Sequence, residues 1–126
     1  DEYDPLSCLF SVLHEGGHGL YEQGQAPTLW GRGLFGGSSL GIHESQSRLW
    51  ENLVGRSRAF WQTFFPRFQH AFAPVLDHVT LDEFLIAVNR VKPSPIRVEA
   101  DEATYNLHIL LRYRLEKALL SGDLSV

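Results

Sequence analysis

Apolar residues recur every three or four positions near the start of the chain, which predicts an amphipathic helix from about Pro5 to Tyr21. Asp4 is a favourable N-cap for this helix, and a proline suits its first turn. The apolar side of the helix comprises Leu6, Leu9, Phe10, Leu13 and Leu20. The same stretch contains three glycines, Gly16, Gly17 and Gly19. Because each glycine costs a helix about 1 kcal/mol relative to alanine, we expect that substrate or another backbone comes close to the helix here.

A second long helix is predicted after an irregular connection. Residues 23–37 contain repeated glycines and a proline, which interrupt regular structure. Ser38 or Ser39 then caps a helix that begins near Leu40 and continues, with or without a kink, to about residue 65. Pro66 is expected to end this helix, and a further helical stretch covers residues 67–72.

The remaining pattern is also helical. Residues 80–83, Thr-Leu-Asp-Glu, form a capping box, and apolar positions follow it at helical spacing. Residues 92–95, Lys-Pro-Ser-Pro, end that helix, and the β-branched stretch 96–98 is expected to be extended. A last helix is predicted over residues 99–121, ended by Gly122. No strand pattern is strong, so we expect an all-α fold, a helical bundle segment.

Composition narrows the class of protein. The length of 126 residues fits a single domain, residues 1–126, and a hydrophobic content of 44% is ordinary for a globular chain. A net charge of −4 without a basic patch argues against a nucleic-acid partner. No apolar run approaches the ~20 residues of a membrane helix, and the single cysteine, Cys8, fits a reducing, cytoplasmic location. Because the chain lacks any methionine, we interpret it as a segment of a longer protein.

The most informative motif is His14-Glu15-Gly16-Gly17-His18. Two histidines four residues apart lie on one face of a helix, so their imidazoles can reach one ion. Glu15 adds a carboxylate that can hold and deprotonate a metal-bound water, as in the HExxH motif of zinc peptidases. The alternative is a pair of surface histidines, which the apolar flanks and adjacent glycines disfavour.

A catalytic zinc usually has three protein ligands and one open position. The best candidate for the third ligand is Glu44, near the start of the second helix, and the rival is His43. Two antiparallel helices would then meet at one ion. With Glu15 as general base, the remaining need is a donor for the oxyanion, which His43 could supply. An imidazole that simply bonds to a neighbour is an equally good interpretation of His43.

Three stretches resemble the thermostable (Taq-type) metallocarboxypeptidase family. They are residues 14–23, residues 41–52 and residues 96–109. The resemblance covers essentially the whole chain and implies that His14, His18 and Glu44 bind the metal. It also implies that Glu15 is the general base and that the cofactor is zinc, with cobalt as an alternative. The fold implied is a zincin-like, almost wholly helical enzyme, about four times longer than this chain, that forms homodimers.

The same resemblance implies removal of residues from the C-termini of peptides or proteins. A free carboxylate is best bound by an arginine, and Arg97 is our candidate; a salt bridge with Glu99 or Asp101 is the alternative. Tyr105 and His108 belong to a polar stripe on the last helix and are candidate substrate-binding residues. Glu51 and Glu102 are candidates to orient the ligand histidines. The alternative function is an inactive helical fragment or binding module with a vestigial metal site.

Overall fold

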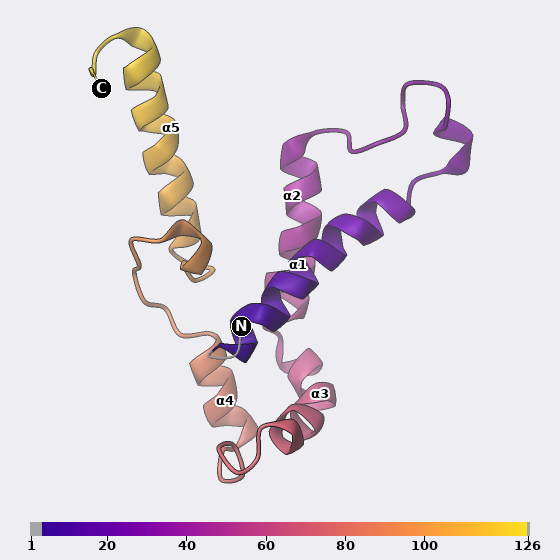
Figure 1. Cartoon of the computed structure of the whole chain (residues 1–126), viewed down its shortest axis with the longest axis vertical. Helices are drawn as coiled ribbons and strands as arrows, with labels where there is room; N and C mark the ends of the chain where they lie inside the picture. Colours follow the sequence, from indigo (N-terminus) through magenta and orange to yellow (C-terminus); the bar gives the residue numbers. More distant parts are fainter. Residues whose placement is uncertain (1–3, 126) are drawn as a thin grey trace. The chain divides into compact units, whose positions relative to one another are not determined.

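The computed structural model describes residues 4–125, which form helices and turns without a strand (Figure 1). The longer helices are α1 (Pro5–Gln23), α2 (Leu40–Arg48), α3 (Arg58–Ala71), α4 (Leu81–Val88) and α5 (Tyr105–Ser121). Three shorter helical turns are η1 (Pro27–Leu29), η2 (Leu49–Val54) and η3 (Arg97–Glu99). The all-helical prediction is therefore confirmed. Within the described residues, no helix is both long and apolar enough to cross a membrane.

The chain divides into two compact units, residues 1–85 and residues 86–126, with the boundary inside α4. The first unit contains α1, α2 and α3, and the second contains η3 and α5. Each unit is described by itself below. The single-domain interpretation of residues 1–126 stays a prediction.

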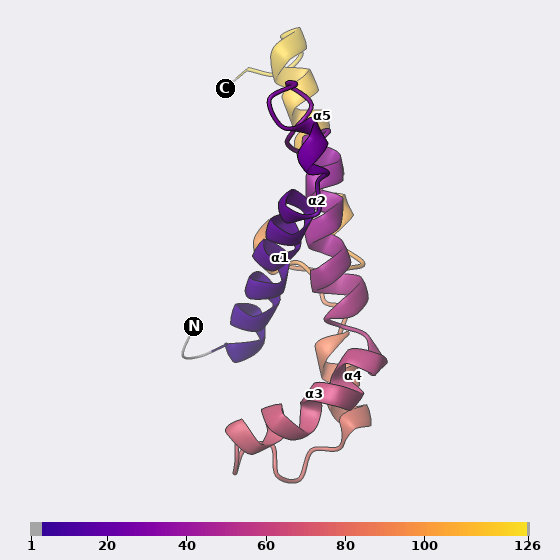
Figure 2. The same cartoon turned by 90° about the vertical axis from the view of Figure 1, so that its right-hand side faces the viewer.

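In the first unit, α1 lies beside α2 and its continuation η2 (Figures 1 and 2). The two helices run antiparallel, because residues near the end of α1 contact the start of α2 and residues further back contact η2. Gly17 makes this approach possible, since a Cβ atom there would lie 2.7 Å from the Cα atom of Ser47. Gly55, just after η2, likewise leaves room for α1, because a Cβ atom there would lie 2.6 Å from the side chain of Leu13. The expectation of a close backbone approach on α1 is thus confirmed at Gly17.

A second cluster in the same unit consists of aromatic side chains on α3 that pack against α4. Trp61 is fully buried, and its ring centroid lies 4.5 Å from that of Phe84 and 5.3 Å from that of Phe68. Phe65 is also buried against Phe84. These contacts hold α3 to the first turn of α4, where Arg58 also forms an ion pair with Asp82.

Several helix ends agree with the sequence. The side chain of Asp4 accepts a hydrogen bond from the backbone of Ser7, and Ser39 caps α2 in the same way. Thr80 and Glu83 form the predicted capping box, in which each side chain accepts the backbone N–H of the other. Gly122 ends α5 with a left-handed φ of 79°, a conformation that glycine adopts without strain.

Four predictions about the type or the boundaries of elements were wrong. The long second helix is interrupted at residues 55–57, and α3 continues through Pro66 instead of ending before it. Proline removes the hydrogen bond to the carbonyl of Gln62, but that residue is exposed, so water can replace the lost donor. The stretch around Arg97 is a helical turn rather than extended. The last helix begins at Tyr105, because Asp101 accepts hydrogen bonds from the backbone of the two residues just before the helix.

Candidate metal centre

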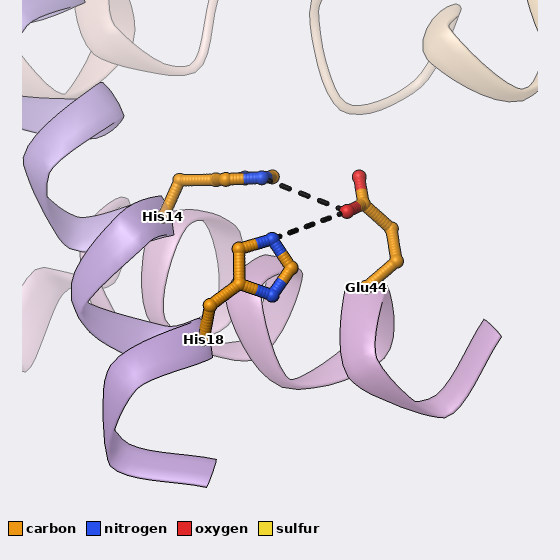
Figure 3. Close-up of side chains that lie close together, drawn as sticks. All are labelled: His14, His18 and Glu44. Atoms are coloured by element: carbon orange, nitrogen blue, oxygen red, sulfur yellow. Dashed lines mark ion pairs between the residues drawn. The ribbon is translucent and has the colours of Figure 1, made fainter. Parts of the chain in front are cut away.

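The two motif histidines lie one turn apart on α1 and project from the same face. The ring centroids of His14 and His18 are 4.9 Å apart, with the rings nearly perpendicular. Glu44, the fifth residue of α2, projects toward both rings (Figure 3). The close packing at Gly17 allows the three side chains to approach one another, because it brings the backbone of α2 against α1 within one turn of each histidine.

The three side chains have the spacing of a ligand set. Oε2 of Glu44 lies 3.6 Å from Nε2 of His14 and 3.5 Å from Nε2 of His18 (Figure 3). One donor atom from each residue lies within 4.8 Å of the other two. Donor atoms bound tetrahedrally at ~2.0–2.2 Å from one ion would be about 3.4 Å apart. The residues therefore fit a divalent metal ion such as zinc, with two neutral nitrogen donors and one carboxylate.

Glu51 and Arg48 support this set from η2 and the end of α2. Oε2 of Glu51 lies 2.8 Å from Nδ1 of His14, the ring nitrogen that faces away from Glu44. The guanidinium of Arg48 donates to the same oxygen at 2.9 Å, and its Nε lies 3.4 Å from Glu44. Arg48 thus offsets part of the negative charge of two carboxylates, and Glu51 fixes the orientation of His14.

His43 is surrounded by residues of α1. Its Nδ1 lies 2.6 Å from Nδ1 of His18, and its Nε2 lies 2.8 Å from a carboxylate oxygen of Glu22. The ring of Tyr21 meets it edge-on, with the centroids 5.1 Å apart. Two hydrogen bonds from Ser38, from its side chain and its backbone N–H, lower the pKa of the Tyr21 hydroxyl. Both ring nitrogens of His43 are therefore occupied, and its predicted role as oxyanion donor stays a prediction.

Glu15 is exposed on α1, between the two motif histidines in sequence but on an adjoining face of the helix. It lies at one end of an open depression on the surface of α1. The depression is lined by Ser7, Cys8, Ser11, Val12, Glu15 and Gly16. A carboxylate in such a position is accessible to water, as a general base must be.

The candidate substrate-binding residues lie in the second unit. A guanidinium nitrogen of Arg97 donates to the hydroxyl of Tyr105, and the guanidinium carbon lies 5.5 Å from the centre of the Tyr105 ring. His108 lies almost one turn further along α5 and is half-buried. Asp101 orders the segment that joins η3 to α5. Its carboxylate accepts the backbone N–H of Lys92, and it also accepts hydrogen bonds from residues 103 and 104.

Sequence reasoning named Glu51 and Glu102 as candidates to orient a ligand histidine, and Glu51 is the one that contacts His14. It missed Glu22, the partner of His43. A signal was present, since Glu22 lies four residues after His18 and therefore on the same face of α1. The signal was ambiguous, because an exposed glutamate at this spacing more often faces solvent.

Known proteins with similar sequences are carboxypeptidases. The chain is 60% identical over 117 residues to thermostable carboxypeptidase 1 of Thermus thermophilus, covering 93% of this chain and 23% of that protein. It is 47% identical over 126 residues to carboxypeptidase 1 of Bacillus subtilis, covering 100% of this chain and 25% of that protein. The chain thus spans about a quarter of the length of these relatives.

Solved structures agree. The M32 carboxypeptidase of Deinococcus radiodurans R1 superimposes with a TM-score of 0.93 at 54% identity, covering 98% of this chain and 25% of that one. Over residues 1–126 the sequence matches the family described as carboxypeptidase Taq (M32) metallopeptidase. The predicted resemblance is therefore confirmed, and so is the arrangement of the motif helix against a second, carboxylate-bearing helix. The chain belongs to the M32 family of metallopeptidases.

Proposed function

We propose that this chain supplies the metal-binding core of a zinc-dependent metallocarboxypeptidase, which hydrolyses the C-terminal bonds of peptides or proteins. The cluster of His14, His18 and Glu44 is the observation that carries the proposal, because three donor atoms from two helices converge on one point. Family membership supports the proposal, since a relative that matches this chain over its whole length is named a carboxypeptidase. Zinc is the metal we propose, with cobalt as the alternative, because two imidazoles and one carboxylate are a usual zinc set.

Each residue of the core has a distinct role in this proposal. His14, His18 and Glu44 hold the ion, which when bound supplies a Lewis acid and lowers the pKa of a coordinated water. Glu15 takes a proton from the attacking water and delivers it to the leaving amine, as general base and then general acid. Its exposure on α1 leaves it free to contact water and substrate.

Substrate recognition is assigned to the second unit. Arg97 binds the free carboxylate of the substrate, because a guanidinium can donate two parallel hydrogen bonds to a carboxylate. Tyr105 already accepts a hydrogen bond from Arg97, so its ring and hydroxyl hold the guanidinium in one orientation. Tyr105 and His108 are proposed to contact the substrate beside it.

The chain spans about a quarter of the length of its relatives. We therefore propose the activity for a full-length protein of the family that contains this chain. This protein is called the full-length enzyme below. We also propose that this full-length enzyme forms a homodimer. The competing function is a helical binding module whose metal site is vestigial.

The proposal is tested by metal removal and readdition. The full-length enzyme is stripped with a chelator and assayed on an N-blocked peptide with either a free or an amidated C-terminus. We expect no hydrolysis without metal, recovery at one equivalent of zinc, and cleavage of the free-carboxylate peptide only. Activity that persists without metal, or equal cleavage of both peptides, would refute a metallocarboxypeptidase.

A further inference from the structure

His18 differs from His14 in the residue that contacts its Nδ1 atom. The ring of His14 is backed directly by the carboxylate of Glu51, whereas the ring of His18 is backed by a second imidazole, His43. That imidazole is in turn bonded to the carboxylate of Glu22. Two candidate ligands on the same helix are therefore oriented in two different ways, one directly by a carboxylate and one through a second imidazole.

His43 is held in place from several sides. Its side chain is 25% exposed and lies between α1 and the start of α2. The edge-on contact with Tyr21 fixes one side of the ring. On another side, a Cβ atom at Gly37 would lie 2.7 Å from Cδ2 of His43, so only glycine leaves room for the ring without a shift. The position of the ring is thus set by packing as well as by its hydrogen bonds.

The direction of the hydrogen bonds follows from the chemistry of His18. Its Nε2 faces Glu44 and must keep a lone pair to bind a metal, so its proton lies on Nδ1. That N–H donates to Nδ1 of His43, which leaves the proton of His43 on Nε2. The Nε2–H then donates to the carboxylate of Glu22. Every donor in this series has an acceptor, and the series ends on a negative charge.

We infer that Glu22 and His43 form a hydrogen-bonded bridge that positions His18 as a metal ligand. This inference rests on the proposed function, because it assumes that His18 binds a metal. His43 acts through His18 and is a positioning residue, and Glu22 acts through His43. In this arrangement the proton on Nε2 of His43 is committed to Glu22, whereas an oxyanion donor would need it for the substrate.

Partners of this kind change metal affinity by about 10–100-fold when they are removed. Glu22→Gln weakens the acceptor while keeping its shape, and His43→Ala removes the bridge. Because Glu22 acts only through His43, the double variant should bind zinc no more weakly than His43→Ala alone. Two independent effects would instead multiply.

The test measures the zinc dissociation constant of the full-length enzyme by competition with a chromophoric chelator. Glu116→Gln, which removes an exposed carboxylate from α5, is the control for loss of charge and should leave the constant unchanged. The visible spectrum of the cobalt-loaded protein is the second readout. It should change in His43→Ala, because the ligand field changes, whereas simple destabilisation would leave the spectrum of the folded protein as it was.

The outcomes separate this inference from the function on which it rests. A wild-type protein that binds no zinc would refute the proposed function and the bridge together. Wild-type binding with unchanged affinity and unchanged cobalt spectra in both variants would refute the bridge alone. Unchanged affinity with a reduced kcat in His43→Ala would also refute it and would favour His43 as the oxyanion donor.

Discussion

In the first unit, side chains from two antiparallel helices converge on one point, and a second layer of residues holds them there. His14 is bonded to Glu51, and His18 is bonded to His43. In the second unit, α5 has no buried residue among those that the structure describes. Arg97 donates a hydrogen bond to the hydroxyl of Tyr105, and Asp101 organises the turn between η3 and α5. The difference teaches that one helix pair brings together three residues that could hold a metal ion. The proposed substrate-binding residues Arg97 and Tyr105 are instead ordered by contacts within a short stretch of chain.

The largest effect of any substitution is expected at Glu15, in the first unit. Glu15→Gln should lower kcat of the full-length enzyme by roughly 10²–10⁴-fold, because a positioned general base contributes about that much. Zinc content should stay at one equivalent, since Glu15 does not belong to the ligand cluster. Steady-state kinetics and elemental analysis of the same preparation check both statements. If Glu15→Gln kept its activity, the role of Glu15 as general base would be contradicted.

Arg97 tests whether substrate selection belongs to the second unit. Arg97→Ala should reduce the preference for a free over an amidated C-terminus by roughly 10–150-fold, because a charged hydrogen bond contributes about 1.5–3 kcal/mol. Arg97→Lys is the matched variant and should recover part of the preference, since it keeps the charge and loses the bidentate geometry. The ratio of kcat/KM for the two peptides is the measurement. An unchanged ratio in Arg97→Ala would show that another group binds the carboxylate.

Gly17 tests the packing on which the first unit depends. Gly17→Ala should lower the free energy of unfolding by about 1–3 kcal/mol, because its Cβ atom would meet the backbone of Ser47 at 2.7 Å and of Gln46 at 2.8 Å. Gly19→Ala is the control, since a Cβ atom there meets nothing within 4 Å and alanine favours the helix. Thermal unfolding of the full-length enzyme compares them. Equal stability of the two variants would contradict the close approach of α1 and α2.

Asp101 should give the smallest effect, confined to the second unit and dependent on pH. Desolvation raises the pKa of this carboxyl, but hydrogen bonds from Lys92, Thr104 and Ala103 outweigh it, so the pKa is lowered. A lowered folded pKa contributes stability that is present above the unfolded pKa and is lost as pH falls through the folded value. Asp101→Asn should therefore be less stable than wild type at neutral pH, and the deficit should shrink below about pH 4.

Thermal unfolding between pH 7 and pH 3 checks the effect of Asp101. Glu102→Gln is the control, because Glu102 is the exposed carboxylate next to it and should show no such trend. A deficit in Asp101→Asn that stays constant over this range would mean that the carboxylate charge does not organise the turn.

The sequence predicted the parts of the molecule that depend on local rules. The motif helix, its Asp4 cap, the capping box at Thr80 and the end of α5 at Gly122 all follow from side chains within a few residues of each other. The packing of the motif helix against a second helix could also be predicted, because a glycine such as Gly17 on α1 leaves room for the backbone of a neighbouring helix.

What the sequence did not give depended on tertiary contacts or on solvent. Pro66 is tolerated inside α3 because Gln62, whose carbonyl loses its helical donor, is an exposed residue, and exposure is a property of the fold rather than of the local sequence. Glu22 was missed because its partner, His43, is 21 residues away. The start of the last helix was placed too early because the side chain of Asp101 competes for backbone N–H groups that would otherwise begin the helix.

Anomalous diffraction at the zinc absorption edge, on crystals of the full-length enzyme, tests the metal assignment most directly. We expect one peak about 2.0–2.2 Å from Nε2 of His14, Nε2 of His18 and an oxygen of Glu44. The same peak should be absent from crystals of Glu44→Ala, or much weaker. A zinc peak bound by His43 instead of Glu44, or zinc found only away from the two motif histidines, would contradict the assignment.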